Sequence, residues 1–215
     1  SLRIIGMSAY QQEDYPAAEK SLKAAVAKHP EDAEAIYTLA RTYLDMEEYN
    51  KAIPWFEKAI KQPNAKNTWM YELGLLYYNQ SDYKNASNAI NMAADNGYVQ
   101  SLDFKENMGF ASLYSGDYEK GEKLLLDIYA KKPGNKDLLR DMASAFYAQR
   151  QYDKSLDYCQ KLLEIDDKDG KALYQAGLAF QKKGEKDRGQ KMCDKAIDID
   201  PSLASLRTKK EIPGL

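Results

Sequence analysis

A tyrosine returns along this chain at an almost constant interval. Tyr15, Tyr49, Tyr83, Tyr118 and Tyr152 are separated by 34, 34, 35 and 34 residues. Each follows a short polar stretch and precedes a run with helical spacing, as in "SGDYEKGEKLLLDI" from Ser115 to Ile128. Self-similarity at a period of about 20–50 residues is typical of repeat architectures. This period therefore constrains the fold more than any local motif does.

Two further series of positions, both restricted to small residues, keep the same register. One lies nine residues before each of the five tyrosines and the other three residues after it: Gly6, Ala40, Gly74, Gly109 and Ala143, then Ala18, Ala52, Ala86, Gly121 and Ser155. Gly177 and Gly189 continue the two series by one further period, where Lys186 takes the place of the tyrosine. Two helices approach closely only where neither carries a bulky side chain at the crossing. Each repeat is therefore predicted to be a pair of antiparallel helices, whose exposed apolar face is covered by the next pair.

The recurring tyrosine is predicted to lie at the start of the second helix of each pair. Asp14, Asp82 and Asp117 precede it, where a carboxylate can cap the exposed amides of that helix. The ring can pack over the turn while its hydroxyl reaches water or a backbone group. We therefore interpret these tyrosines as structural and not catalytic.

The pattern resembles the tetratricopeptide repeat family. "MYELGLLY" from Met70 to Tyr77 matches the first helix of the family motif, and "AIPWFEKAI" from Ala52 to Ile60 matches the second. The resemblance implies an all-α fold, a right-handed α-solenoid of stacked antiparallel helix pairs. It covers residues 1–201 as six repeats, at approximately 1–32, 33–66, 67–101, 102–135, 136–169 and 170–201, followed by a C-terminal capping helix and tail at 202–215.

Several classes of function are not supported by the sequence. A formal net charge of −2 gives no broad basic surface for nucleic acid, and no apolar run approaches the roughly 18 residues that span a membrane. The only histidine, His29, lies in a predicted loop, and no Gly-rich phosphate loop is present. We therefore expect no enzymatic activity, no metal and no cofactor.

The two cysteines, Cys159 and Cys193, are 34 residues apart and so occupy the same position in neighbouring repeats. Stacked helices lie about 8–10 Å apart, whereas a disulfide needs Cα atoms nearer 5.5 Å. We interpret both as buried, reduced, structural thiols. The sequence begins at Ser1 inside a helical pattern, so we expect a soluble protein that is cytoplasmic or, if a signal peptide was removed upstream, exported.

In the family that the chain resembles, the first helices line a concave groove that usually holds an extended peptide or a helix of a partner. The matching register predicts these partner-binding residues: Tyr37, Arg41, Tyr71, Glu72, Tyr78, Glu106, Phe110, Arg140, Tyr147 and Tyr174. Aromatic residues are the usual anchors of interfaces. The alternative for any single ring is that it packs against the neighbouring repeat.

The middle of this predicted groove is acidic. Between repeats two and five, Arg41 and Arg140 are outnumbered by Glu34, Asp45, Glu72, Asp103, Glu106, Asp137 and Asp141. This imbalance predicts a partner segment with basic and apolar character. Co-chaperones of the family hold a C-terminal carboxylate with Lys and Asn, but the matching residues here are Arg3, Met7, Thr38, Thr68 and Glu72, which makes a heat-shock-protein tail a poor ligand.

We therefore predict a non-enzymatic protein-binding scaffold or assembly factor, whose partner is a protein or peptide segment. The alternative is a structural solenoid that associates with itself and holds no foreign peptide, which would make the protein a homo-oligomer.

Overall fold

The computed structural model describes residues 1–208, and within them every regular element is helical, which confirms the predicted all-α fold. Thirteen α-helices and one 3₁₀ turn (η1) follow one another along the chain. Their bounds are α1 Leu2–Gln11, α2 Tyr15–Lys28, α3 Ala33–Asp45, α4 Tyr49–Ile60, α5 Asn67–Asn79, α6 Tyr83–Asp95, α7 Leu102–Ser115, α8 Tyr118–Lys131, α9 Lys136–Ala148, α10 Tyr152–Ile165, α11 Gly170–Lys182, α12 Lys186–Ile199, η1 Pro201–Leu203 and α13 Ala204–Thr208. None of these helices is both long and apolar enough to cross a bilayer.

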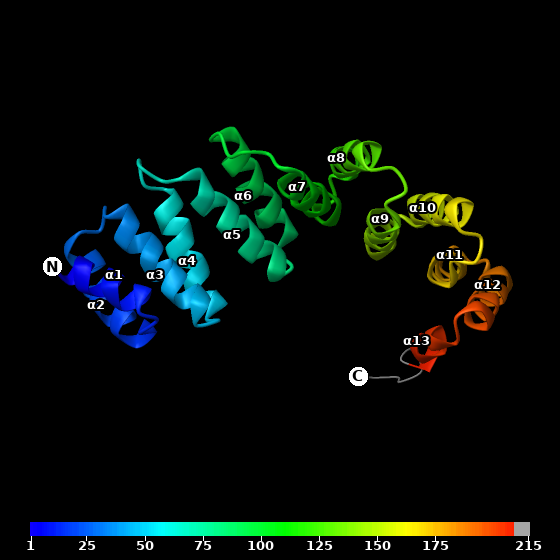
Figure 1. Ribbon diagram of the computed structural model, residues 1–215, viewed down its shortest axis with the longest axis horizontal. Helices are drawn as coiled ribbons and strands as arrows, with labels where there is room; N and C mark the ends of the chain where they lie inside the picture. Colours follow the sequence, from blue (N-terminus) through cyan, green and yellow to red (C-terminus); the bar gives the residue numbers. More distant parts are fainter. Residues whose placement is uncertain (209–215) are drawn as a thin grey trace. The chain divides into compact units, whose positions relative to one another are not determined.

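The chain forms two compact units, Ser1–Ala111 and a second that begins at Ser112, and α7 runs from the first into the second. In the N-terminal unit, α1 packs on α2, α3 on α4 and α5 on α6, and each pair contacts the next. In the C-terminal unit, α9 packs on α10 and α11 on α12. There α9, α11 and α13 lie along one side of the stack, and α8, α10 and α12 along the other (Figure 1). We call the surface of the odd-numbered helices, within each unit, the first-helix face.

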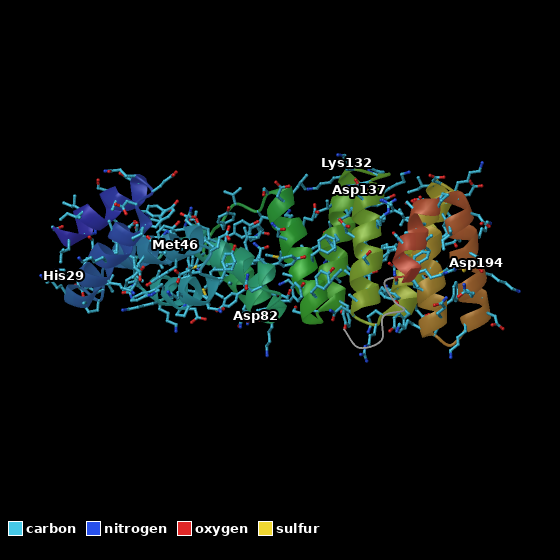
Figure 2. All side chains as sticks on the ribbon, turned by 90° about the horizontal axis from the view of Figure 1, so that it is seen from below. His29, Met46, Asp82, Lys132, Asp137 and Asp194 are labelled. Atoms are coloured by element: carbon cyan, nitrogen blue, oxygen red, sulfur yellow. The ribbon has the colours of Figure 1, made fainter. Side chains whose placement is uncertain are left out.

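The predicted caps are present at the starts of the second helices. Asp14, Asp82 and Asp117 accept hydrogen bonds from the amides of Ala17, Asn85 and Lys120, at 3.2, 3.3 and 3.4 Å. Asp82 lies at the start of α6 (Figure 2). These bonds satisfy amides that have no partner inside the helix, and they fix where each second helix begins.

The small residues lie where the two helices of a pair cross. Gly6, Gly74, Gly177 and Gly189 are buried, and a Cβ built on Gly74 would lie 2.6 Å from Cγ1 of Ile90. Ser155 uses its small size differently, because its hydroxyl donates to the carbonyl of Ala143 on the partner helix at 2.8 Å. The predicted size restriction is thus a consequence of close helix packing.

The turns inside the repeats share a feature that the sequence pattern did not reveal. One residue of each turn has a positive φ between 58° and 95°, in the left-handed region: Glu13, Glu47, Ser81, Gly116, Arg150 and Gly184. The left-handed conformation costs an L-residue roughly 1–2 kcal/mol, and only two of the six positions hold glycine. Four turns therefore carry a local energetic cost that the packed helices offset.

Replacing Arg150 with glycine is expected to raise the free energy of unfolding by about 0.5–1 kcal/mol. Removing the Cβ relieves the left-handed strain, and the greater freedom of glycine in the unfolded chain offsets part of that gain. Gly184→Ala, at the equivalent turn, has no atom within 4 Å of the new Cβ and should lower the same quantity. Urea denaturation measures both; changes of the same sign would contradict this explanation.

The C-terminal elements cover the last helix pair. Leu203 of η1 is buried against Leu173, Tyr174, Cys193 and Ala196. The sequence predicts a capping helix and tail over 202–215, of which the structure describes η1 in part and α13. Residues 209–215, which belong to that prediction, lie outside the described part of the chain.

Candidate functional site

In the N-terminal unit, three predicted partner-binding residues bind one another. Tyr37 of α3 donates its hydroxyl to both carboxylate oxygens of Glu72 on α5, at 2.9 and 3.0 Å. Arg41 donates to the same carboxylate at 3.3 Å. Burial raises the pKa of Tyr37 to about 12, with the charge of Glu72 adding to the effect, so Tyr37 remains a neutral donor at physiological pH. This cluster couples the second repeat to the third.

Much of the predicted acidic character of this face is neutralised locally. Glu34 pairs with Lys66 at 2.6 Å, and Asp45 accepts from the Tyr10 hydroxyl at 2.6 Å and lies 3.8 Å from Arg41. Sequence reasoning missed Lys66 because it lies between helices, immediately before α5. Asp103 and Asp141 are exposed and form no ion pair within residues 1–208.

Two of the predicted anchor rings pack against the neighbouring repeat. The ring of Tyr37 stacks on Trp69 at 4.5 Å between centroids, with Phe56 5.9 Å away. Tyr71 lies 4.7 Å from the ring of Tyr98 and 4.9 Å from that of Phe104. For both rings the structure therefore agrees with the alternative interpretation, in which the ring packs against a neighbouring repeat and does not form an open binding surface.

The other predicted rings fall into two groups. Phe110 and Tyr174 are only 8% and 5% exposed, which departs from the expectation that they offer open surface. Tyr78 and Tyr147 are half-buried, and each rests on the recurring tyrosine that starts the next helix, at 5.2 and 5.5 Å between ring centroids. These two present ring surface on the first-helix face. Glu106 is also partly exposed there.

In the C-terminal unit, Arg140 of α9 joins two repeats. Its guanidinium binds Asp137 at 3.0 Å and Asp169 at 2.8 Å. Asp137, labelled in Figure 2, is highly exposed, whereas the side chain of Asp169 is 6% exposed and also caps α11 through the amide of Ala172. A guanidinium on a nearly buried carboxylate is strongly directional, so Arg140 is held against the neighbouring repeat.

Beside Arg140, the first-helix face is hollowed by a cavity of about 420 Å³. It is lined by side chains of α9, α10, α11 and the C-terminal elements: Arg140, Ala143, Ser144, Cys159, Leu162, Lys171, Ala172, Tyr174, Gln175, Leu178, Leu203 and Leu206. Its size and mainly apolar lining are typical of a ligand-binding cavity. Of the predicted partner-binding residues, Arg140 and Tyr174 take part in it.

The histidine and the cysteines are the first residues to consider for metal binding or nucleophilic chemistry. Within residues 1–208 no three metal-ligating side chains cluster. His29 lies in the loop after α2 (Figure 2), 3.7 Å from the exposed Glu31 carboxylate. Cys159 is fully buried, and burial raises its pKa from 9.0 to about 12, which suppresses the reactive thiolate.

Both cysteines are buried thiols and neither is in a disulfide. We expect Cys159 and Cys193 to resist an aromatic disulfide reagent at pH 8 in the native protein, and to react fully in denaturant. Cys193 is buried away from the cavity, and Cys159, although it lines the cavity, has a raised pKa that keeps its thiol protonated at this pH. Absorbance of the released thiolate measures the reaction. Rapid labelling of Cys159 in the native protein would contradict its structural role.

Comparison with known proteins points to one family. A model described as tetratricopeptide repeat matches residues 5–66, 37–98 and 109–170, and a second with the same description matches 170–203. The human protein O-mannosyl-transferase TMTC1 is 28% identical over 166 residues, which are 76% of this chain and 18% of that protein. A TPR repeat-containing protein of Methanocaldococcus jannaschii is 26% identical over 77% of this chain and 29% of its own length. The chain thus spans less than a third of these relatives.

Solved structures share the fold at low identity. YrrB, described as a TPR protein with an unusual peptide-binding site, aligns with a TM-score of 0.55 and 22% identity, over 90% of this chain and all of YrrB. MamA from Desulfovibrio magneticus, from its residue 41 onward, aligns with a TM-score of 0.56 and 15% identity, over 79% of this chain and 96% of that one. At such identities the likeness concerns the fold alone.

Proposed function

The chain belongs to the tetratricopeptide repeat family, and from this premise we propose that it is a non-enzymatic scaffold or assembly factor that holds a segment of a partner protein on its first-helix face. Tetratricopeptide repeats generally mediate protein–protein interaction. The observation that carries the proposal is the cavity in the C-terminal unit, because two of the residues that the family register assigns to partner binding, Arg140 and Tyr174, line it. A hollow with an apolar lining gives a partner side chain somewhere to bind.

The partner segment is proposed to be apolar and basic. Half-buried Tyr78 and Tyr147 offer ring surface to apolar side chains, and exposed Asp103 and Asp141 offer carboxylates to lysine or arginine. Although Asp141 is exposed as a residue, partial burial of its carboxyl raises its pKa; the nearby charge of Asp137 adds to the rise and that of Arg140 opposes it. A basic residue placed beside Asp141 would relieve that repulsion.

Affinity for a partner captured from native lysate and identified by mass spectrometry tests the proposal. Tyr78→Ala and Tyr147→Ala are expected to cost about 1–3 kcal/mol of binding free energy in calorimetry, because truncating an interface ring removes anchor area. Lys58→Ala, on the second helix α4, is the control and should bind as the unchanged protein does. Equal losses in all three variants would place the binding surface elsewhere.

One observation favours the alternative of self-association. Ile4 and Ile5 of α1 are 64% and 56% exposed, whereas Leu39 and Leu73, which hold the position of Ile5 in the next two repeats, are at most 1% exposed. Light scattering over a range of concentrations distinguishes the two functions. A mass that rises with concentration in the absence of a partner supports self-association, and a constant mass supports the binding of a foreign segment.

A further inference from the structure

The cavity in the C-terminal unit lies where the N-terminal unit carries three packed aromatic rings. At the joint between the second and third repeats, Tyr37, Phe56 and Trp69 come from α3, α4 and α5 and meet as one cluster. Phe56 and Trp69 are at most 2% exposed. The indole of Trp69 therefore fills the space between two successive first helices and the second helix behind them.

At the joint between the fifth and sixth repeats, two of the equivalent positions hold smaller side chains, and the third holds an arginine that is bound outside the space. Arg140 replaces Tyr37, Cys159 replaces Phe56 and Ala172 replaces Trp69. All three line the cavity. Arg140 is long enough to fill it, but its guanidinium is held 2.8 Å from Asp169. The space that an indole fills at one joint is therefore open at the other.

Apolar side chains complete the wall of this space. Leu162, Leu178, Leu203 and Leu206 all line it, and Leu206 is 43% exposed. An open cavity of this kind leaves apolar surface in contact with water, and an aromatic side chain that fills it would bury about 150–250 Å². The shape and lining thus fit a large apolar group.

Three of the side chains that line the cavity present hydrogen-bond donors to it. Nε2 of Gln175 and Nε of Arg140 are buried, and neither has an acceptor within residues 1–208. Lys171 is exposed and forms no ion pair within the same residues. Buried donors without acceptors are costly, and these three groups would be matched by a ligand oxygen that carries negative charge.

We propose that this cavity is a socket for an aromatic side chain of a partner segment, next to an acidic residue whose carboxylate binds Gln175 and Lys171. The inference rests on the proposed function and names what its C-terminal portion recognises. Only the partner residue next to the socket is proposed to be acidic. Elsewhere the partner segment is proposed to carry the basic residues that bind Asp103 and Asp141.

A blocked peptide with the core Asp-(5-fluoro-Trp)-Glu between Gly-Ser flanks tests the socket directly. Fluorine NMR observes the peptide alone, because the protein contains no fluorine. We expect saturable binding to the full chain. In a second peptide, Ala replaces the fluorinated Trp and a trifluoroacetyl group supplies the fluorine signal. Its dissociation constant is expected to be at least about tenfold higher, because the aromatic ring supplies the anchor. A Lys-(5-fluoro-Trp)-Lys peptide should bind more weakly than the acidic one.

Two protein variants fill the socket from within. Ala172→Trp places an indole where Trp69 stands at the other joint, and Ser144→Phe adds a ring from an exposed position at the cavity rim, so folding does not depend on it. Each is expected to weaken binding of the acidic indole peptide at least about tenfold. Gln160→Phe, which adds the same ring to an exposed site on the second helix α10, is the matched control and should leave binding unchanged.

The outcomes separate this inference from the proposed function. Unchanged peptide affinity in folded Ser144→Phe, or no binding to the unchanged protein at millimolar peptide, overturns the socket. Stronger binding of the lysine peptide overturns the acidic preference. If the socket fails while Tyr78→Ala and Tyr147→Ala still weaken the captured partner, the proposed function stands without it.

Discussion

Gly177→Ala is expected to lower the free energy of unfolding by about 2–3 kcal/mol, as overpacking of a rigid contact does. A Cβ on Gly177 would lie 2.6 Å from Sγ of Cys193 and 2.7 Å from the carbonyl oxygen of Gly189. The second of these is backbone of the facing helix α12, so it cannot move without moving the helix. Separating α11 from α12 would also disturb the packing of the capping residue Leu203.

Gly74→Ala, at the equivalent position of the third repeat, is the matched control. Its closest new contact is Cγ1 of the Ile90 side chain at 2.6 Å, and the backbone atoms are 3.1 Å away or more. The Ile90 side chain can shift, and alanine favours the helix by about 1 kcal/mol over glycine. We therefore expect a smaller loss. Chemical denaturation of both variants measures the difference, and equal losses would contradict the distinction between side-chain and backbone contacts.

Trp69→Ala should have the largest effect of any single substitution considered, a loss of about 3–5 kcal/mol of unfolding free energy. The indole is 2% exposed and stacked on Tyr37, so its removal leaves a cavity between the second and third repeats. Trp55→Ala provides the control, because Trp55 is half-buried on α4 and its ring faces Lys58 at 5.2 Å. Thermal and urea denaturation compare them, and a similar loss in both would show that the joint does not depend on the stacked ring.

The parts of this structure that sequence reasoning predicted are those set by local, periodic chemistry. The caps at Asp14, Asp82 and Asp117, and the small residues at the helix crossings, each act within one repeat. Their position in the 34-residue register therefore determines their role. Stacking follows from the same register, since each apolar face needs a neighbour.

The side chains of the first-helix face were harder to predict, because their partners lie about one repeat away. Glu34 binds Lys66, Arg41 binds Glu72 and Arg140 binds Asp169, so counting charges overestimated the free acidity. Burial of Phe110 and Tyr174 likewise depends on what neighbouring helices place against them. The sequence does contain the information that predicts the cavity, because Arg140, Cys159 and Ala172 occupy the positions that Tyr37, Phe56 and Trp69 hold at the other joint. Recognising it requires comparing three positions of two joints together.

The left-handed turns have a consequence for how such a chain can change over time. Glu13, Glu47, Ser81 and Arg150 occupy a turn position suited to glycine, so the packed helices hold these turns in place without it. The fold does not need aromatic rings at every joint, since the positions of Tyr37, Phe56 and Trp69 hold Arg3, Leu22 and Ala35 between the first and second repeats, and Glu106, Leu125 and Leu138 between the fourth and fifth. The proposed socket would then require only smaller side chains at an existing joint, and no additional helix.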